Sequence, residues 1–182
     1  AEKVSSYLVE VYMNTRSYDA ALKSIDRIAK PSAQILEAKQ KILFQLGTQS
    51  FANADFEQAL KYLNQSIAIG QYNRQTKADA YYWCGESYYR LNRMVEAARD
   101  FNAYLQLTTQ PNNEMYALAN YNLGYIAFHR KDYTQASNYF QKYIQLEKGE
   151  NATALADAYN RIGDCHLHVR NFEEAKQYYS CL

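Results

Sequence analysis

Apolar residues recur every three or four positions along most of the chain, as they do on one face of an α-helix. Short polar segments interrupt this period at intervals. The 182 residues include only six glycines and two prolines, which favours helices over many short strands. Pro31 and Pro111 both fall in the interruptions, where they break no helix. We predict ten helices, at about 3–15, 18–29, 33–53, 55–69, 75–91, 93–108, 113–130, 132–147, 151–169 and 171–182.

The same short pattern returns every 38 or 39 residues. Counting from Gly124, the residues at +9, +12 and +16 are Tyr133, Ala136 and Phe140. In every copy, the three offsets give a large residue, an alanine and a second large residue. The five anchors of this pattern are Val9, Gly47, Gly85, Gly124 and Gly163. Such regular self-similarity indicates an array of equivalent structural units.

Glycine inside a helix costs about 1 kcal/mol relative to alanine, so its presence in four of five copies needs a reason. We expect each glycine to mark a close approach of two helices, with the large residue at +9 closing the junction. Polar turns separate the two helices of each copy. Asp55, Asp132 and Asn171 are favourable N-caps for the second helices.

Leu-Gly followed at these offsets by Tyr or Phe, then Ala, then Phe or Tyr resembles the tetratricopeptide repeat. The resemblance implies an all-α, right-handed α-solenoid of about five helix–turn–helix units. Each repeat is four or five residues longer than the usual 34, which adds about one helical turn near the junction between repeats. The expected units are 2–35, 40–73, 78–111, 117–150 and 156–182, in a single array.

The repeat length and openings such as 78–82 and 156–159 are also similar to bacterial envelope proteins. Examples are the periplasmic Tol–Pal-associated coordinator and the lipoprotein of the outer-membrane barrel-assembly machine. This second resemblance favours a periplasmic or envelope-associated location. The chain stops within the last expected helix without a polar cap, so we expect a fragment of a longer protein that forms a homodimer through uncapped ends.

The first resemblance implies that the first helices of successive repeats line a concave ligand groove. Positions −3 and +4 from each glycine are seven residues apart and share a helix face, and in the three central repeats they are all aromatic. The candidate groove residues are Phe44, Phe51, Tyr82, Glu86, Tyr89, Arg90, Tyr121, Tyr125 and Phe128. Asp157, Arg161 and Asp164 are interpreted as solvated groove residues. Two interpretations of the aromatic residues stay open at this stage, a binding surface and the filled inner wall of a tight superhelix.

Composition excludes several other classes of function. The formal net charge of +1 argues against nucleic-acid binding, and no apolar stretch is long enough for membrane insertion. No catalytic or cofactor-binding pattern is present, so we expect neither an enzyme nor a bound cofactor. Cys165, His166 and His168 are close in sequence, but the two histidines project about 200° apart on a helix, so we expect no metal site. His166 is expected in the core beside Gly163.

The leading hypothesis is a scaffold whose aromatic groove binds a peptide or helix of a partner protein. The carboxylate clamp of some members of the family, built from Lys and Asn, is absent, since Thr48 and Glu86 occupy that stretch. Two alternatives stay open. One is a self-assembly module that stacks chains end to end, and the other is a binder of carbohydrate such as an envelope glycan, since aromatic faces stack on sugar rings.

Overall fold

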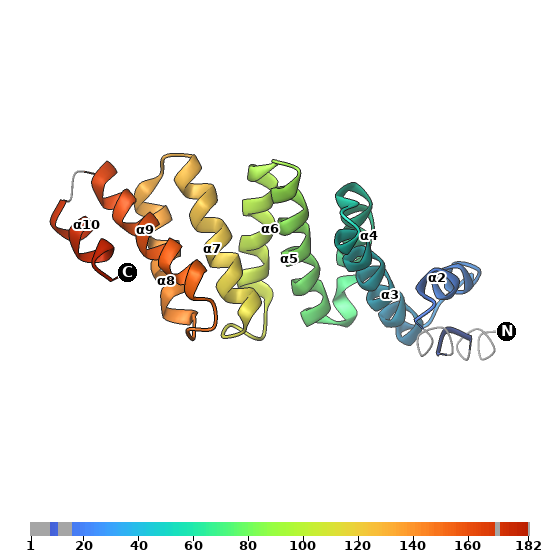
Figure 1. The fold of residues 1–182 in the computed structure, drawn as a ribbon. Helices are drawn as coiled ribbons and strands as arrows, with labels where there is room; N and C mark the ends of the chain where they lie inside the picture. The colour runs from blue at the N-terminus through green and yellow to red at the C-terminus, as the bar shows by residue number, and fades with distance from the viewer. Residues whose placement is uncertain (1–7, 11–15, 170–171, 182) are drawn as a thin grey trace. The chain divides into compact units, whose positions relative to one another are not determined.

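The computed structural model describes residues 8–10, 16–169 and 172–181, without the side chain of Phe172. The chain forms two compact parts, Ala1–Thr109 and Gln110–Leu182. Each part consists of consecutive helices joined by short turns (Figure 1). Within the described residues there is no β-strand.

Among its described residues, the N-terminal part contains the α-helices α2 to α6 and one short 3-10 helix, and residues 8–10 are also helical. Helix α3 packs against α4, α5 packs against α6, and α4 also contacts α5. The elements are α2 (Tyr18–Asp26), α3 (Ala33–Ala52), α4 (Phe56–Ile69), η1 (Gly70–Tyr72), α5 (Arg74–Arg90) and α6 (Met94–Leu107).

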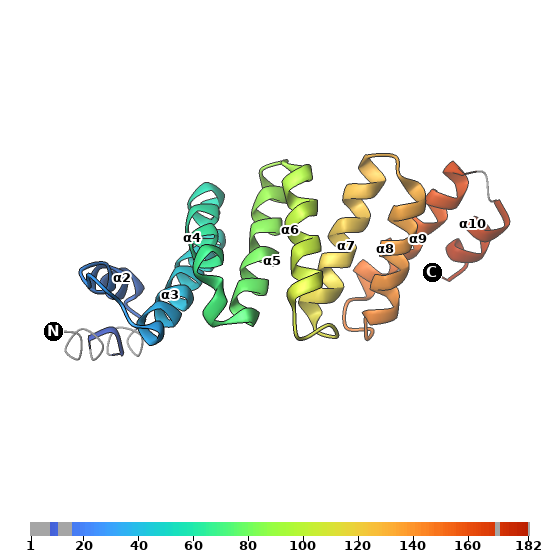
Figure 2. The same ribbon diagram turned by 180° about the vertical axis from the view of Figure 1, so that it is seen from behind.

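The described residues of the C-terminal part form four helices, seen from the opposite side in Figure 2. Helix α8 contacts both α7 and α9, and α10 packs against α9. The helices are α7 (Glu114–His129), α8 (Tyr133–Leu146), α9 (Ala152–His168) and α10 (Phe172–Tyr179). The predicted fold class, an all-α array of helix–turn–helix units, is confirmed. Most of the helix predicted at 3–15 lies outside the described residues.

The anchor glycines lie where two helices of one repeat touch. A Cβ atom added to Gly124 would lie 2.8 Å from the ring of Phe140, closer than real Cβ contacts allow. The same geometry places Gly85 against Phe101 and Gly47 against Leu63. The neighbour of each glycine is therefore the residue at +16. This confirms that the glycines permit close helix packing.

Side chains cap most of the helix N-termini. Asp55 accepts a hydrogen bond from the amide of Gln58 at 3.3 Å, and Asp132 accepts one from the amide of Gln135 at 3.2 Å, as predicted. The third predicted cap, Asn171, lies outside the described residues. The first helices α3, α5, α7 and α9 are capped in the same way, by Ser32, Asn73, Asn113 and Asn151. These caps satisfy amides that have no partner inside the helix.

The turn between the helices of a repeat uses a left-handed residue that the sequence did not predict. Arg16, Ala54, Asn92 and Lys131 have φ angles of 59°, 60°, 59° and 63°. In the third turn of this set the residue is asparagine, which tolerates this conformation, whereas an ordinary side chain is strained there by roughly 1–2 kcal/mol. In these four turns, the end of the first helix therefore has a backbone geometry that glycine would adopt more easily.

Replacing Lys131 with glycine should raise the free energy of unfolding by about 1 kcal/mol, because glycine has no Cβ to clash at positive φ. The measurement is urea denaturation followed by circular dichroism. Lys142→Gly is the matched control, since it removes the same exposed side chain from the interior of α8 and should lower stability by about 1 kcal/mol. A loss of stability in both variants would contradict the prediction.

Candidate functional site

The first helices α3 and α5 bring an aromatic cluster together in the N-terminal part. The ring of Phe51 lies 5.2 Å from the ring of Phe56 and 5.0 Å from that of Trp83, measured between centroids. The guanidinium carbon of Arg90 lies 5.5 Å from the centre of the Phe51 ring. Phe51 and Trp83 are half-buried and Arg90 is exposed, so this cluster presents aromatic surface and a positive charge to solvent.

Tyr82 differs from the other candidate groove residues because its side chain is only 2% exposed. Its ring packs edge-on against Phe101 and Tyr104, at centroid distances of 5.6 and 5.4 Å. Its hydroxyl donates a hydrogen bond of 2.9 Å to Oε1 of Glu86. For Tyr82, the structure therefore favours the core interpretation, with its hydroxyl orienting a carboxylate on the next turn of α5.

Phe44, Glu86 and Tyr89 are half-buried in the same part of the chain. Burial raises the pKa of the Tyr89 phenol, and the negative charge of Glu86 raises it further. Tyr89 is therefore a neutral hydrogen-bonding group at physiological pH. Trp83 also lies in this cluster, and the sequence-based selection missed it because it stands at −2 from Gly85. The one feature of the sequence that could have drawn attention to Trp83 is that it is the only tryptophan in a chain rich in tyrosine.

In the C-terminal part, two candidate groove residues converge on one carboxylate. Tyr121 and Tyr125 of α7 both donate hydrogen bonds to Oδ2 of Asp157 on α9, and the Tyr121 bond measures 2.6 Å. Their rings rest on second-helix aromatics, with Tyr121 4.9 Å from Tyr143 and Tyr125 5.2 Å from Phe140. These bonds join α7 and α9, the first helices of two successive repeats.

The polar network continues along α9. Arg161 pairs with Asp157 at 3.8 Å and with Asp164 at 3.2 Å, and Tyr179 of α10 donates a hydrogen bond of 2.5 Å to Asp164. The three charged side chains are each about 30% exposed, at 31%, 32% and 30%. These residues are thus partly solvated, as expected, and they are also bonded to one another, which the sequence did not predict. With two carboxylates and one guanidinium, the network has a formal charge of −1.

Burial and hydrogen bonding to Asp157 raise the pKa of Tyr121 above its ordinary value and that of Tyr125 to about 12. Burial and the bond to Asp164 likewise raise the pKa of Tyr179 to about 12. All three phenols therefore remain protonated donors at physiological pH. Their hydroxyls are fixed in direction by acceptors within the protein, so this surface is organised before any ligand arrives.

The remaining candidate, Phe128, is half-buried near the C-terminal end of α7. Its ring lies 5.5 Å from Tyr133, which stacks on His168 at 4.1 Å between ring centroids with an angle of 2° between the planes. Tyr133 is the residue at +9 in the fourth repeat, and with these contacts it closes the helix junction, in agreement with the prediction. Phe128 therefore combines a packing role with partial exposure.

His166 is largely buried, with 14% of its side chain exposed, but the side chain that lies against Gly163 is that of Tyr179. His166 instead stacks on Tyr178 at 5.2 Å, and its Nδ1 lies 3.0 Å from Oε2 of Glu174. In the part of the chain that the structure covers, no group of three or more His, Cys, Asp or Glu side chains is arranged to hold a metal ion. Across the same residues, no helix is both long and apolar enough to cross a membrane.

Two models of the tetratricopeptide repeat match three stretches of the sequence. One matches residues 44–114 and another matches residues 117–149 and 156–180. A search of curated protein sequences found no match. Together the repeat models span the candidate groove residues of both parts.

Solved structures with the same fold cover nearly the whole chain. The crystal structure of MamA protein has 19% identity and a TM-score of 0.65, over 98% of this chain and 88% of its own. BtubC (BKLC) from P. vanneervenii has 13% identity and a TM-score of 0.66, over 97% and 76%. YrrB, described as a TPR protein with an unusual peptide-binding site, has 15% identity and a TM-score of 0.64, over 98% and 82%. At these identities the likeness concerns the fold. The narrower resemblance to envelope proteins stays a prediction.

Proposed function

The chain belongs to the tetratricopeptide-repeat family, and from this premise we propose that it is a non-enzymatic scaffold that binds a segment of a partner protein on its first helices. The binding surfaces are the α3–α5 face of the N-terminal part and the α7–α9 face of the C-terminal part. Each face takes a stretch of an extended segment or one side of a helix from the partner.

The observation that carries this proposal is the partial exposure of the aromatic residues on the first helices. Phe44, Phe51, Tyr89, Tyr121, Tyr125 and Phe128 are all half-buried. A filled inner wall would bury these rings fully, as it does for Tyr82 at 2% exposure. Half-buried aromatic rings beside fixed polar groups are typical of protein interfaces, because they offer large contact area at low cost in side-chain entropy.

The two faces contribute in different ways. The α3–α5 face offers the Phe51 and Trp83 rings with the exposed Arg90 guanidinium, which suits an apolar side chain next to an acceptor group on the partner. The α7–α9 face offers the rings of Tyr121 and Tyr125, whose hydroxyls are already held by Asp157. Groups fixed in this way lose little further entropy on binding. The similarity to YrrB, a TPR protein with a peptide-binding site, supports the same class of ligand.

The test begins with a random peptide library displayed on phage and selected on the 182-residue chain. Fluorescence polarisation then measures the affinity of the recovered peptides for the wild-type chain and for an Arg90→Ala/Tyr89→Ala variant. We expect the dissociation constant to rise by about tenfold or more, as is usual for central aromatic and arginine contacts.

Val95→Ser is the matched control, because Val95 is 70% exposed but lies on the second helix α6. It should leave the affinity unchanged. Circular dichroism confirms that both variants are folded. Recovery of no peptide, or an equal loss of affinity in the Val95 variant, would overturn the proposal.

A further inference from the structure

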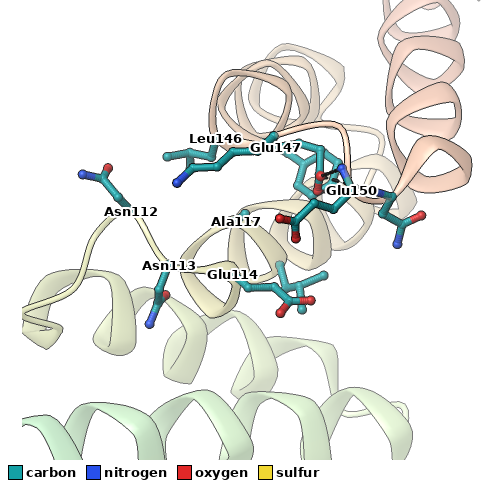
Figure 3. Close-up of a pocket in the computed structure, with 11 residues that line it drawn as sticks. Asn112, Asn113, Glu114, Ala117, Leu146, Glu147 and Glu150 are labelled. Atoms are coloured by element: carbon teal, nitrogen blue, oxygen red, sulfur yellow. Dashed lines mark hydrogen bonds between the residues drawn. The ribbon is translucent and has the colours of Figure 1, made fainter.

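A pocket lies at the ends of three helices of the C-terminal part. It is bounded by the first turn of α7, the last turn of α8 and the segment that links α8 to α9 (Figure 3). Its volume is about 450 Å³. The lining residues are Asn112, Asn113, Glu114, Ala117, Leu118, Tyr143, Leu146, Glu147, Lys148, Glu150 and Asn151.

The inner wall of this pocket is apolar. Tyr143 and Ala117 are 1% and 4% exposed, and Leu118 and Leu146 are half-buried beside them. An aliphatic chain of three or four methylene groups can lie along such a wall while its polar end stays near solvent. The wall alone accepts any small apolar group, so the charges at the rim decide what enters.

Glu147 is a fixed negative charge at this rim. Its carboxylate accepts hydrogen bonds from the Tyr143 hydroxyl at 2.9 Å, the Glu150 amide at 2.9 Å and the Asn151 amide at 3.3 Å. The bond from Tyr143 is the main cause that lowers the pKa of Glu147, so the carboxylate is ionised at physiological pH. It follows directly after α8, an end at which the helix dipole disfavours negative charge. The fold holds an acid there against that preference.

Two further carboxylates stand at the mouth of the pocket. Glu114 comes from the first turn of α7, and Glu150 comes from the α8–α9 link on the facing side (Figure 3). Both are exposed, and among the residues that the structure describes neither carboxylate has an ion-pair partner. Asn113 and Asn151 use their side-chain oxygens as helix caps. With three glutamates and Lys148, the lining has a formal charge of −3 + 1 = −2.

We propose that this pocket binds a lysine or arginine side chain of the partner protein. The methylene stem lies along Tyr143, Leu118 and Leu146, and the cationic end lies between Glu114 and Glu150. Charge complementarity and the apolar wall together select a basic side chain over a neutral apolar one or an acidic one. The inference builds on the proposed function, since it names one feature of the bound segment, but no residue that lines the pocket is one of the half-buried aromatic residues that carry that function.

The first experiment needs no partner. N-acetyl-arginine methylamide and N-acetyl-lysine methylamide are titrated into the 15N-labelled chain, with N-acetyl-norleucine methylamide as the uncharged control of similar length. The basic probes should shift backbone amides in 114–118 and 147–151, and norleucine should not. In the Glu114→Gln/Glu150→Gln variant the dissociation constant should rise about tenfold. Equal shifts with norleucine, or unchanged shifts in the variant, would overturn the proposal.

The second experiment separates this inference from the proposed function. Peptides selected on the chain should contain a basic residue. Replacing that residue with norleucine should weaken binding of the peptide to the wild-type chain about tenfold. The same replacement should leave binding to the Glu114→Gln/Glu150→Gln variant unchanged. Glu57→Gln, an exposed change on α4, is the matched control. One outcome is that peptides bind and lose affinity for the Arg90→Ala/Tyr89→Ala variant, yet show no preference for a basic residue that depends on Glu114 and Glu150. In that case only the inference about the pocket fails. If no peptide binds, the proposed function fails and the small-probe titration still decides the pocket.

Discussion

Replacing Phe140 with alanine should lower the free energy of unfolding by about 3–5 kcal/mol, the usual range for a fully buried aromatic side chain. Phe140 is 0% exposed, lies against Gly124 and packs edge-on against the ring of Tyr125 at 5.2 Å. Removing the ring leaves a cavity between α7 and α8 that neighbouring helices cannot fill without moving. Urea denaturation followed by circular dichroism measures the loss, and a loss below about 1 kcal/mol would contradict this account of the packing.

A double-mutant cycle tests the reason for the glycine. Gly124→Ala alone should destabilise by about 1–3 kcal/mol, because the new methyl group would lie 2.8 Å from the Phe140 ring. In a Phe140→Ala background the ring that the new methyl group would meet is absent, so the cost of the same change should fall. Gly70→Ala is the control, since its neighbour is the flexible side chain of Lys77. An equal cost in both backgrounds would show that the ring is not the cause.

Replacing Asp157 with alanine should lower the free energy of unfolding by about 2 kcal/mol, because Tyr121 and Tyr125 lose a charged hydrogen-bond acceptor. Water replaces part of each lost bond, since the Asp157 side chain is 31% exposed. Arg161 also loses one of its two carboxylate partners.

Asp157→Asn is the matched control for this second change. It keeps an acceptor oxygen of the same size and should retain more than half of the stability that alanine loses. The readout is again the midpoint of urea denaturation, followed by circular dichroism. Alanine and asparagine variants as stable as the wild type would show that the network does not join the two helices.

The helices and their packing residues could be predicted because the information is local. The spacing of Gly124, Ala136 and Phe140 predicts which residues face the helix junction. In the structure, Gly124 lies against the ring of Phe140. The caps Asp55 and Asp132 could be predicted for the same reason, because each accepts a hydrogen bond from an amide only three residues further along the chain. The left-handed turn residues were not, because Ala54 and Lys131 carry none of the glycine signal that normally marks such a position.

The candidate site was harder to predict because it depends on how each helix pair is rotated. Positions −3 and +4 share a face, but how far that face is covered differs between repeats. Tyr82 and Tyr121 both rest on the second helix of their own repeat, 5.4 Å from Tyr104 and 4.9 Å from Tyr143. Tyr82 is buried and bonds to Glu86 on its own helix, whereas Tyr121 is half-buried and bonds to Asp157 on the next first helix. The pocket beside Glu147 is formed by helix ends and a link, where no periodic pattern exists to read.

Buried polar residues show the same limit. Gln40 is 0% exposed in α3, donates a hydrogen bond of 2.8 Å to the carbonyl of Asn73, and receives one of 2.7 Å from Ser66 at its own carbonyl. A hydrophobic pattern assigns a glutamine to the surface. Only the packing of α3, α4 and the link to α5 explains why this position holds a residue that can donate to a backbone carbonyl.

The most direct test of the central claim is to map where a library-selected peptide binds, by chemical-shift perturbation on the 15N-labelled chain. The account predicts that the largest changes fall on the first helices, around Phe51, Trp83 and Arg90 in α3 and α5 and around Tyr121, Tyr125 and Asp157 in α7 and α9. Changes confined to the second helices α4, α6 and α8 would contradict it.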